Sequence, residues 1–152
     1  MPIKQLFIIA ILISMITMGK EISQPPSEKT FSSCQTKIHE IKEQINKIQN
    51  KKEALSFLGK KYKEVVGEMS NNKVWRYDIC SVPGYQFSSE VDQVDLEGLF
   101  AKDVKQIIFI SFAEDNRTIQ SKSLYYLDKN KNIHEMKFIA NEIYENTISL
   151  NE

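Results

Sequence analysis

Few residues in this 152-residue chain are of the types that most often catalyse reactions or bind transition metals. The sequence contains two cysteines, Cys34 and Cys80, and two histidines, His39 and His134. No second histidine lies at metal-ligand spacing from either one, and the cysteines are far apart along the chain. A nucleophile-elbow motif, a phosphate-binding glycine loop and a zinc-protease helix motif are also missing. The sequence therefore predicts a non-catalytic protein without a metal or cofactor.

Two acidic segments could bind a cation or a basic partner surface. The sequence DKNKN at 128–132 opens like a calcium-binding loop, but Ile133 and Ile139 stand where that loop requires Gly and Glu. A tight turn is therefore the better interpretation. The second segment, EVDQVDLEG, is acidic in the way that solvated faces commonly are. With two nearby aromatic residues it forms the candidate partner-binding region: Tyr85, Phe87, Glu90, Asp92, Asp95 and Glu97.

The first 19 residues have the pattern of a signal peptide. Lys4 precedes an uncharged run from Leu6 to Met18, and this run is shorter than a typical membrane-spanning helix. An uncleaved short anchor is the alternative, and it would be the protein's contact with a membrane. Residues 20–30 contain a Pro-Pro pair and few apolar side chains, which is typical of a flexible tether.

A signal peptide predicts an exported protein, periplasmic or secreted. Export would place Cys34 and Cys80 in an oxidising compartment, where an intramolecular disulfide between them is favoured. Two buried free thiols and an intermolecular bridge are the alternatives.

The balance of charge is neutral, with 20 basic and 20 acidic residues, so the sequence does not predict nucleic-acid binding. Residues 31–152 are long enough for one domain with its own core.

Apolar residues recur at helical spacing from residue 32 to residue 48. The stripe consists of Cys34, Ile38, Ile41, Ile45 and Ile48. Packing of this stripe on a sheet of the same molecule is the ordinary interpretation, and dimerisation through the Ile38-Ile41-Ile45-Ile48 stripe is the alternative. Asn50 with Glu53 predicts the start of a second helix over 51–58, and Gly59 is a typical residue after its end.

Strand-forming residues dominate the rest of the chain. The predicted strands cover 74–79, 105–113, 119–127 and 132–139. Alternation places Trp75, Tyr77 and Ile79 on one face of the first strand and Val74, Arg76 and Asp78 on the other. The connection 81–104 is long enough to contain a short helix, and a helix could end the chain. The predicted fold is α+β, with two N-terminal helices packed on one face of an antiparallel sheet of three to five strands.

Three segments resemble the BamE (SmpA/OmlA) family and the wider β-lactamase-inhibitor-like group of small exported modules: NKKEALSFLGKKY, NNKVWRYDI and SLYYLDKNKNIHEMKF. The shared features are Leu58-Gly59, Trp75-x-Tyr77 and a closing hairpin from Leu124 to Phe138. The chain differs in having no lipidation cysteine after the signal and Lys60-Lys61 where a proline is usual. The long 81–104 connection and the striped helix are further differences. The resemblance implies a protein-binding role, including accessory roles in outer-membrane protein assembly, and no catalytic residues.

We therefore predict an exported, non-catalytic protein-interaction module with a protein partner in the cell envelope. One alternative is a secreted inhibitor or effector that binds an enzyme through the acidic loop and a sheet edge. A second alternative is a protein that binds a small apolar ligand, which would require a suitable pocket.

Overall fold

The computed structural model describes Cys34 and residues 38–149. The predicted signal peptide or anchor at 1–19 and the predicted tether at 20–30 lie outside the described residues. Within the described part, no helix has the length and apolar character needed to cross a membrane. The elements follow in the order α1 (Ile38–Lys47), α2 (Lys51–Leu58), β1 (Lys63–Val66), β2 (Lys73–Ile79), α3 (Leu96–Ala101), β3 (Gln106–Phe112), β4 (Ile119–Leu127), β5 (Ile133–Ile139) and β6 (Glu142–Ile148).

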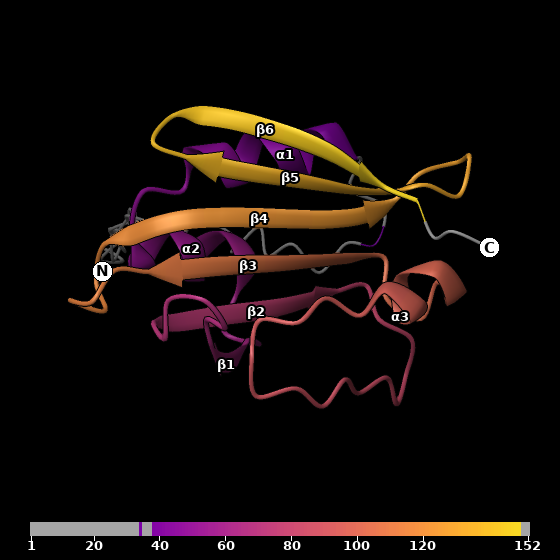
Figure 1. The fold of residues 1–152 in the computed structure, drawn as a ribbon, viewed down its shortest axis with the longest axis horizontal. Coiled ribbons are helices and arrows are strands. Elements are labelled where there is room, and N and C mark those ends of the chain that lie inside the picture. Colours follow the sequence, from indigo (N-terminus) through magenta and orange to yellow (C-terminus); the bar gives the residue numbers. More distant parts are fainter. Residues whose placement is uncertain (1–33, 35–37, 150–152) are drawn as a thin grey trace, which may run out of the picture.

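The strands form one antiparallel sheet in which each strand pairs with its neighbour in the sequence (Figure 1). This order makes β1 and β6 the two edges of the sheet. β5 and β6 are joined by Ala140 and Asn141, whose φ angles are 48° and 72°. Positive φ at both central residues is the backbone of the two-residue hairpin turn that matches strand twist.

α1 and α2 cover one face of the sheet (Figure 1). The isoleucine stripe is buried there through Ile41 and Ile45 of α1 and Ile48 just after it. The sheet contributes Trp75, Tyr77, Ile79, Ile108, Ile110, Phe112, Leu124, Met136 and Phe138 to the same core. The alternation predicted for β2 is confirmed, because Val74 belongs to the core on the opposite face.

The local sequence around α2 explains its two ends. The side-chain oxygen of Asn50 accepts a hydrogen bond from the Glu53 N–H at 3.0 Å, and the Glu53 carboxylate accepts one from the Gln49 N–H at 2.7 Å. The first bond satisfies an N–H group that the first helical turn leaves without a partner, and the second fixes the residue that precedes the cap. Gly59 ends the helix with a φ of 82° and donates its N–H to the Leu55 carbonyl. The predicted second helix is confirmed with the same bounds.

The opposite face is partly covered by the 81–104 connection and by α3 (Figure 1). Leu99 and Val104 are buried there against Ile107, Phe109 and Ile133 of the sheet. The short helix predicted within this connection is present as α3. Both faces of the sheet therefore have a hydrophobic core, each with its own cover.

The α+β class is correct, but the predicted arrangement was wrong in three respects. The sheet has six strands and not three to five, because β1 and β6 were not predicted. The two helices span residues 38–58, within the chain and not at its N-terminus, and α3 packs on the other face. The end of the chain continues as strand β6 through Ile148, where the sequence suggested a helix.

Three residues of the isoleucine stripe pack inside the molecule, and dimerisation through the stripe stays a prediction. Ile41, Ile45 and Ile48 are each at most 1% exposed and are covered by the sheet of the same molecule. The end of α1 is also tied to β4, because the buried ammonium of Lys122 donates hydrogen bonds to the carbonyls of Asn46 and Ile48. Burial lowers the pKa of Lys122, since the charged form loses hydration.

Candidate functional site

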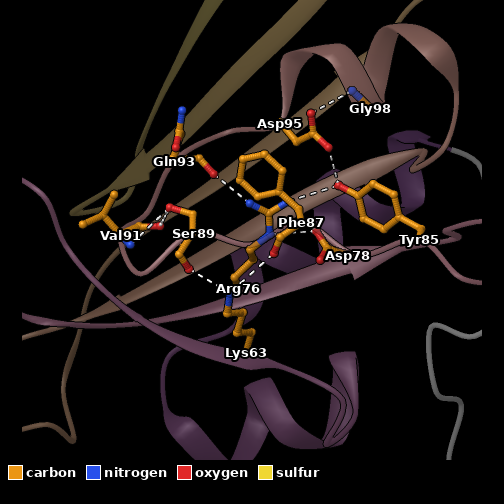
Figure 2. A network of polar contacts seen from close by, with 10 residues as sticks. All are labelled: Lys63, Arg76, Asp78, Tyr85, Phe87, Ser89, Val91, Gln93, Asp95 and Gly98. Carbon is orange, nitrogen blue, oxygen red and sulfur yellow. Dashed lines mark hydrogen bonds and ion pairs between the residues drawn. The ribbon is translucent and has the colours of Figure 1, made fainter.

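A buried arginine holds the 81–104 connection against the sheet (Figure 2). Arg76 is 1% exposed and lies on the β2 face opposite α1 and α2. Its guanidinium pairs with Asp78 at 2.8 Å and donates to the Gln93 carbonyl at 2.7 Å. The Phe87 ring lies over the guanidinium, with its centroid 4.4 Å from Cζ. A buried guanidinium needs this many partners because desolvation of an unpaired charge is costly.

Tyr85 links this arginine to the start of α3 (Figure 2). The Tyr85 hydroxyl lies 3.4 Å from Nη2 of Arg76 and donates to the Asp95 carboxylate at 2.8 Å. Asp95 also accepts the Gly98 N–H at 2.8 Å and thereby caps α3. Burial, together with the bond to Asp95, raises the pKa of Tyr85 well above its ordinary value. The hydroxyl therefore remains a hydrogen-bond donor at physiological pH.

The same connection continues along the outer side of β1. Residue Val66 donates its N–H to the Glu90 carbonyl at 2.9 Å and accepts the Asp92 N–H at 3.0 Å. The Asp92 carboxylate accepts the Glu68 N–H at 2.8 Å. Lys63 donates to the Ser89 carbonyl at 2.8 Å (Figure 2). Residues 90–92 thus occupy part of the outer edge of β1.

The structure therefore separates the six predicted partner-binding residues into two groups. Tyr85, Phe87, Asp92 and Asp95 are half-buried and hold the connection to the sheet. Glu90 and Glu97 are exposed. Four of the six side chains therefore have partners within the molecule, and the binding of a partner by this group stays a prediction.

Cys34 and Cys80 are joined as a disulfide, with their Cα atoms 5.3 Å apart. The bond connects the segment before α1 to the residue that follows β2. Disulfides are typical of oxidising compartments, so the pairing is consistent with an exported protein.

The opposite edge of the sheet, β6, has no described segment along its outer side. All but the last of its seven residues are exposed. Its backbone therefore presents N–H and C=O groups that a further strand could pair with. Sequence reasoning missed this edge because the segment EIYENTI carries polar residues on both faces and shows no alternation.

Three large apolar side chains are exposed beside this edge. Ile143 and Tyr144 of β6 are 50% and 49% exposed, and Ile139 at the end of β5 is 42% exposed. In the register of the hairpin, Tyr144 lies opposite Lys137 and Ile143 lies opposite Phe138. Tyr144 therefore faces the side of the connection, and Ile143 faces the side of α1. A strand that paired with β6 could therefore pack an apolar side chain against Tyr144 on one face of the sheet and against Ile143 on the other.

Polar side chains attach β6 to the rest of the molecule near its middle. Glu145 lies 3.6 Å from the ammonium of Lys42 in α1 and 3.4 Å from Nδ1 of His134 in β5. His134 contacts Asp128 through Nε2 at 3.0 Å.

The other histidine, His39, is exposed on α1. Among the described residues, no group of three or more His, Cys, Asp or Glu side chains is placed to bind a metal ion.

Comparisons of this chain with protein-family models, with curated proteins and with solved structures found no match. The candidate site is therefore defined by its own geometry: a seven-residue edge strand whose outer side pairs with no described residue and which is flanked by exposed apolar side chains.

Proposed function

We propose that this chain is an exported, non-catalytic protein-interaction module that binds an extended segment of its partner along the free edge of β6. The observation that carries the proposal is that no segment among residues 38–149 pairs with the outer side of β6. Proteins commonly protect exposed edges by shortening or covering them, so a long uncovered edge needs an explanation. Strand addition to such an edge is a common mode of peptide recognition.

The composition of β6 favours selective binding over unspecific aggregation. Backbone hydrogen bonds would supply affinity without depending on the partner's sequence, while Ile143 and Tyr144 would select apolar side chains on the two faces. Glu142 and Glu145 place acidic groups on the strand, and charges on an edge oppose indiscriminate pairing. The partner segment should therefore combine apolar with neutral or basic side chains.

An accessory role in envelope assembly extends this proposal. It is supported by the resemblance to BamE-like modules and by the disulfide between Cys34 and Cys80, which suits an oxidising compartment. The proposed partner is accordingly a protein of the cell envelope.

The proposal can be tested by capturing partners of the purified domain from envelope extract. The variant Ile143→Lys places a charge at the edge, and Met69→Lys is the matched control because Met69 is fully exposed at a turn far along the sheet from β6. We expect the wild-type protein and Met69→Lys to retain one partner that Ile143→Lys loses. Binding of that partner should also slow amide exchange in β6. A partner that binds Ile143→Lys equally well, without protecting β6, would contradict the proposal.

A further inference from the structure

A pocket of about 550 Å³ opens where strand ends of the sheet meet α3 and the start of α1. Its volume lies in the range typical of small-molecule sites. Ile38 and Tyr126 reach it from the core under α1, while Leu99, Val104 and Leu127 reach it from the core under α3. The pocket is therefore an apolar opening between the two layers that cover the sheet.

Three lysines surround this apolar opening: Lys102, Lys105 and Lys129. All three are exposed, and within the described part of the chain none of them forms an ion pair. Asp128 also lines the pocket, and its carboxylate is bonded to His134 at 3.0 Å. The three ammonium groups outnumber this one carboxylate, so the rim of the pocket carries a net positive charge over an apolar interior.

Two local features support a ligand at this position. Lys102 ends α3 with a φ of 65°, a left-handed conformation that Gly or Asn adopts more easily. Lysine is unfavourable in this backbone conformation, but at this position its side chain places a cation at the rim of the pocket. Gln106 lines the pocket, and its buried side-chain oxygen has no hydrogen-bond partner among the described residues. A buried amide oxygen without a donor is costly, and an amide that turns its N–H groups toward the pocket would donate to a ligand acceptor there.

We propose that this pocket binds a free single-chain amphiphile with an anionic headgroup, such as a fatty acid. Its hydrocarbon chain would contact the half-buried side chains of Ile38, Tyr126 and Leu127, and its carboxylate would lie among the three lysines. The side-chain amide of Gln106 would complete the polar contacts, because an amide can turn either its oxygen or its nitrogen toward the ligand. This site uses none of the residues of the β6 edge and does not depend on the function proposed for that edge.

Dodecanoate is the probe for this proposal, used below its aggregation concentration with the disulfide-bonded protein. Calorimetry should detect binding, and amide chemical shifts should change at residues of α3 and at the end of β4. Shortening the chain should weaken binding about fourfold per methylene, since each buried methylene contributes about 0.8 kcal/mol. Dodecyltrimethylammonium and acetate, which lack the anionic head and the chain respectively, should bind at least tenfold more weakly.

The lysines are tested by the triple variant Lys102→Gln, Lys105→Gln, Lys129→Gln. The matched control replaces three exposed lysines elsewhere, Lys52, Lys60 and Lys61, by Gln. We expect the first variant to lose at least tenfold in dodecanoate affinity and the control to keep the wild-type affinity. Equal binding of the cationic amphiphile, shifts confined to other regions, or binding to anionic vesicles without binding to free dodecanoate would overturn the proposal. Partner capture through β6 should be unchanged in the triple variant, so the two proposals can fail separately.

Discussion

β1 and β6 are the two edges of one sheet, but only β1 has a described segment along its outer side. β1 has four residues, and the backbone of residues 90–92 bonds to Val66 at its end. β6 has seven residues, and no described residue pairs with its outer side. An unpaired edge offers hydrogen-bonding groups to any other chain. Within the described residues, the fold therefore protects one edge of the sheet and leaves the other without a pairing segment.

The protection of β1 depends on a network centred on Arg76, several residues away from Val66. Arg76 fixes Gln93 and Phe87, while Lys63 holds Ser89, so the connection is anchored on both sides of residues 90–92 (Figure 2). A buried charge with several partners is a specific anchor, because a displaced connection would leave that charge without partners. The long 81–104 connection therefore has a structural role in addition to any binding role.

The largest expected effect comes from removing this anchor with Arg76→Leu. Asp78 would lose its partner and the Gln93 carbonyl would lose its donor, so we expect the free energy of unfolding to fall by about 3–5 kcal/mol. Urea denaturation measures this loss. Amide exchange at Val66 and Asp92 should become faster, and the β1 edge should then resemble the β6 edge in protection.

Arg117→Leu is the matched control, because Arg117 is an exposed residue of the turn between β3 and β4. Its effect on stability should be within about 0.5 kcal/mol. If the two variants lose similar stability, or if exchange at Val66 is unchanged in Arg76→Leu, the network does not protect β1.

The sequence predicted the elements that lie in the middle of the fold. The spacing of Ile41, Ile45 and Ile48 and the alternation of Trp75, Tyr77 and Ile79 are both caused by burial on one side, and burial leaves a periodic pattern. β6 is exposed on both faces, so burial imposes no period on it, and its sequence could not be distinguished from that of a polar helix. β1 was missed because four residues are too few to show a pattern.

Prediction from the sequence met the same limit at the 81–104 connection. Alternation correctly placed Arg76 on the face opposite Trp75, but it could not predict that residues 85–95 would cover that face. The acidic and aromatic residues of the connection were predicted to bind a partner. Most of them contact Arg76, Glu68 or α3 within the molecule, since a buried guanidinium and a helix N-terminus recruit the same residue types as a partner surface would. Their binding of a partner stays a prediction. The tertiary structure decides which surface these acidic and aromatic side chains contact.

A smaller effect is expected at the turn that joins β5 to the open edge. Ala140 has a φ of 48°, a conformation that costs an L-residue with a side chain roughly 1 kcal/mol. Ala140→Gly should therefore raise the free energy of unfolding by up to about 1 kcal/mol and slow amide exchange in β6. Ala101→Gly, in the last residue of α3, is the control and should destabilise the protein. A loss of stability in both variants would show that the turn conformation does not limit the hairpin.

The smallest effect concerns the turn before β5, the strand on which β6 depends for its pairing. Asp128 accepts hydrogen bonds from His134 and from the N–H groups of Asn130 and Asn132, and these bonds lower the pKa of Asp128 from 3.8 to about 2. A lowered pKa in the folded state means that the ionised carboxylate stabilises the fold above its ordinary pKa. This contribution is lost as the pH falls from about 4 toward 2.

Asp128→Asn should therefore be less stable than the wild-type protein at pH 7 and should approach it in stability as the pH falls toward 2, because an increasing fraction of the wild-type carboxylate is then protonated. Melting temperatures of both proteins at pH 7, 4 and 2 measure the difference. Glu97→Gln, which changes an exposed carboxylate on α3, is the control and should show no such convergence. If the gap between wild type and Asp128→Asn is the same at pH 2 as at pH 7, the turn does not depend on ionised Asp128. The support of β5, and through it of the open edge, would then come from the backbone of the hairpin and the apolar contacts of Ile133 and Ile148.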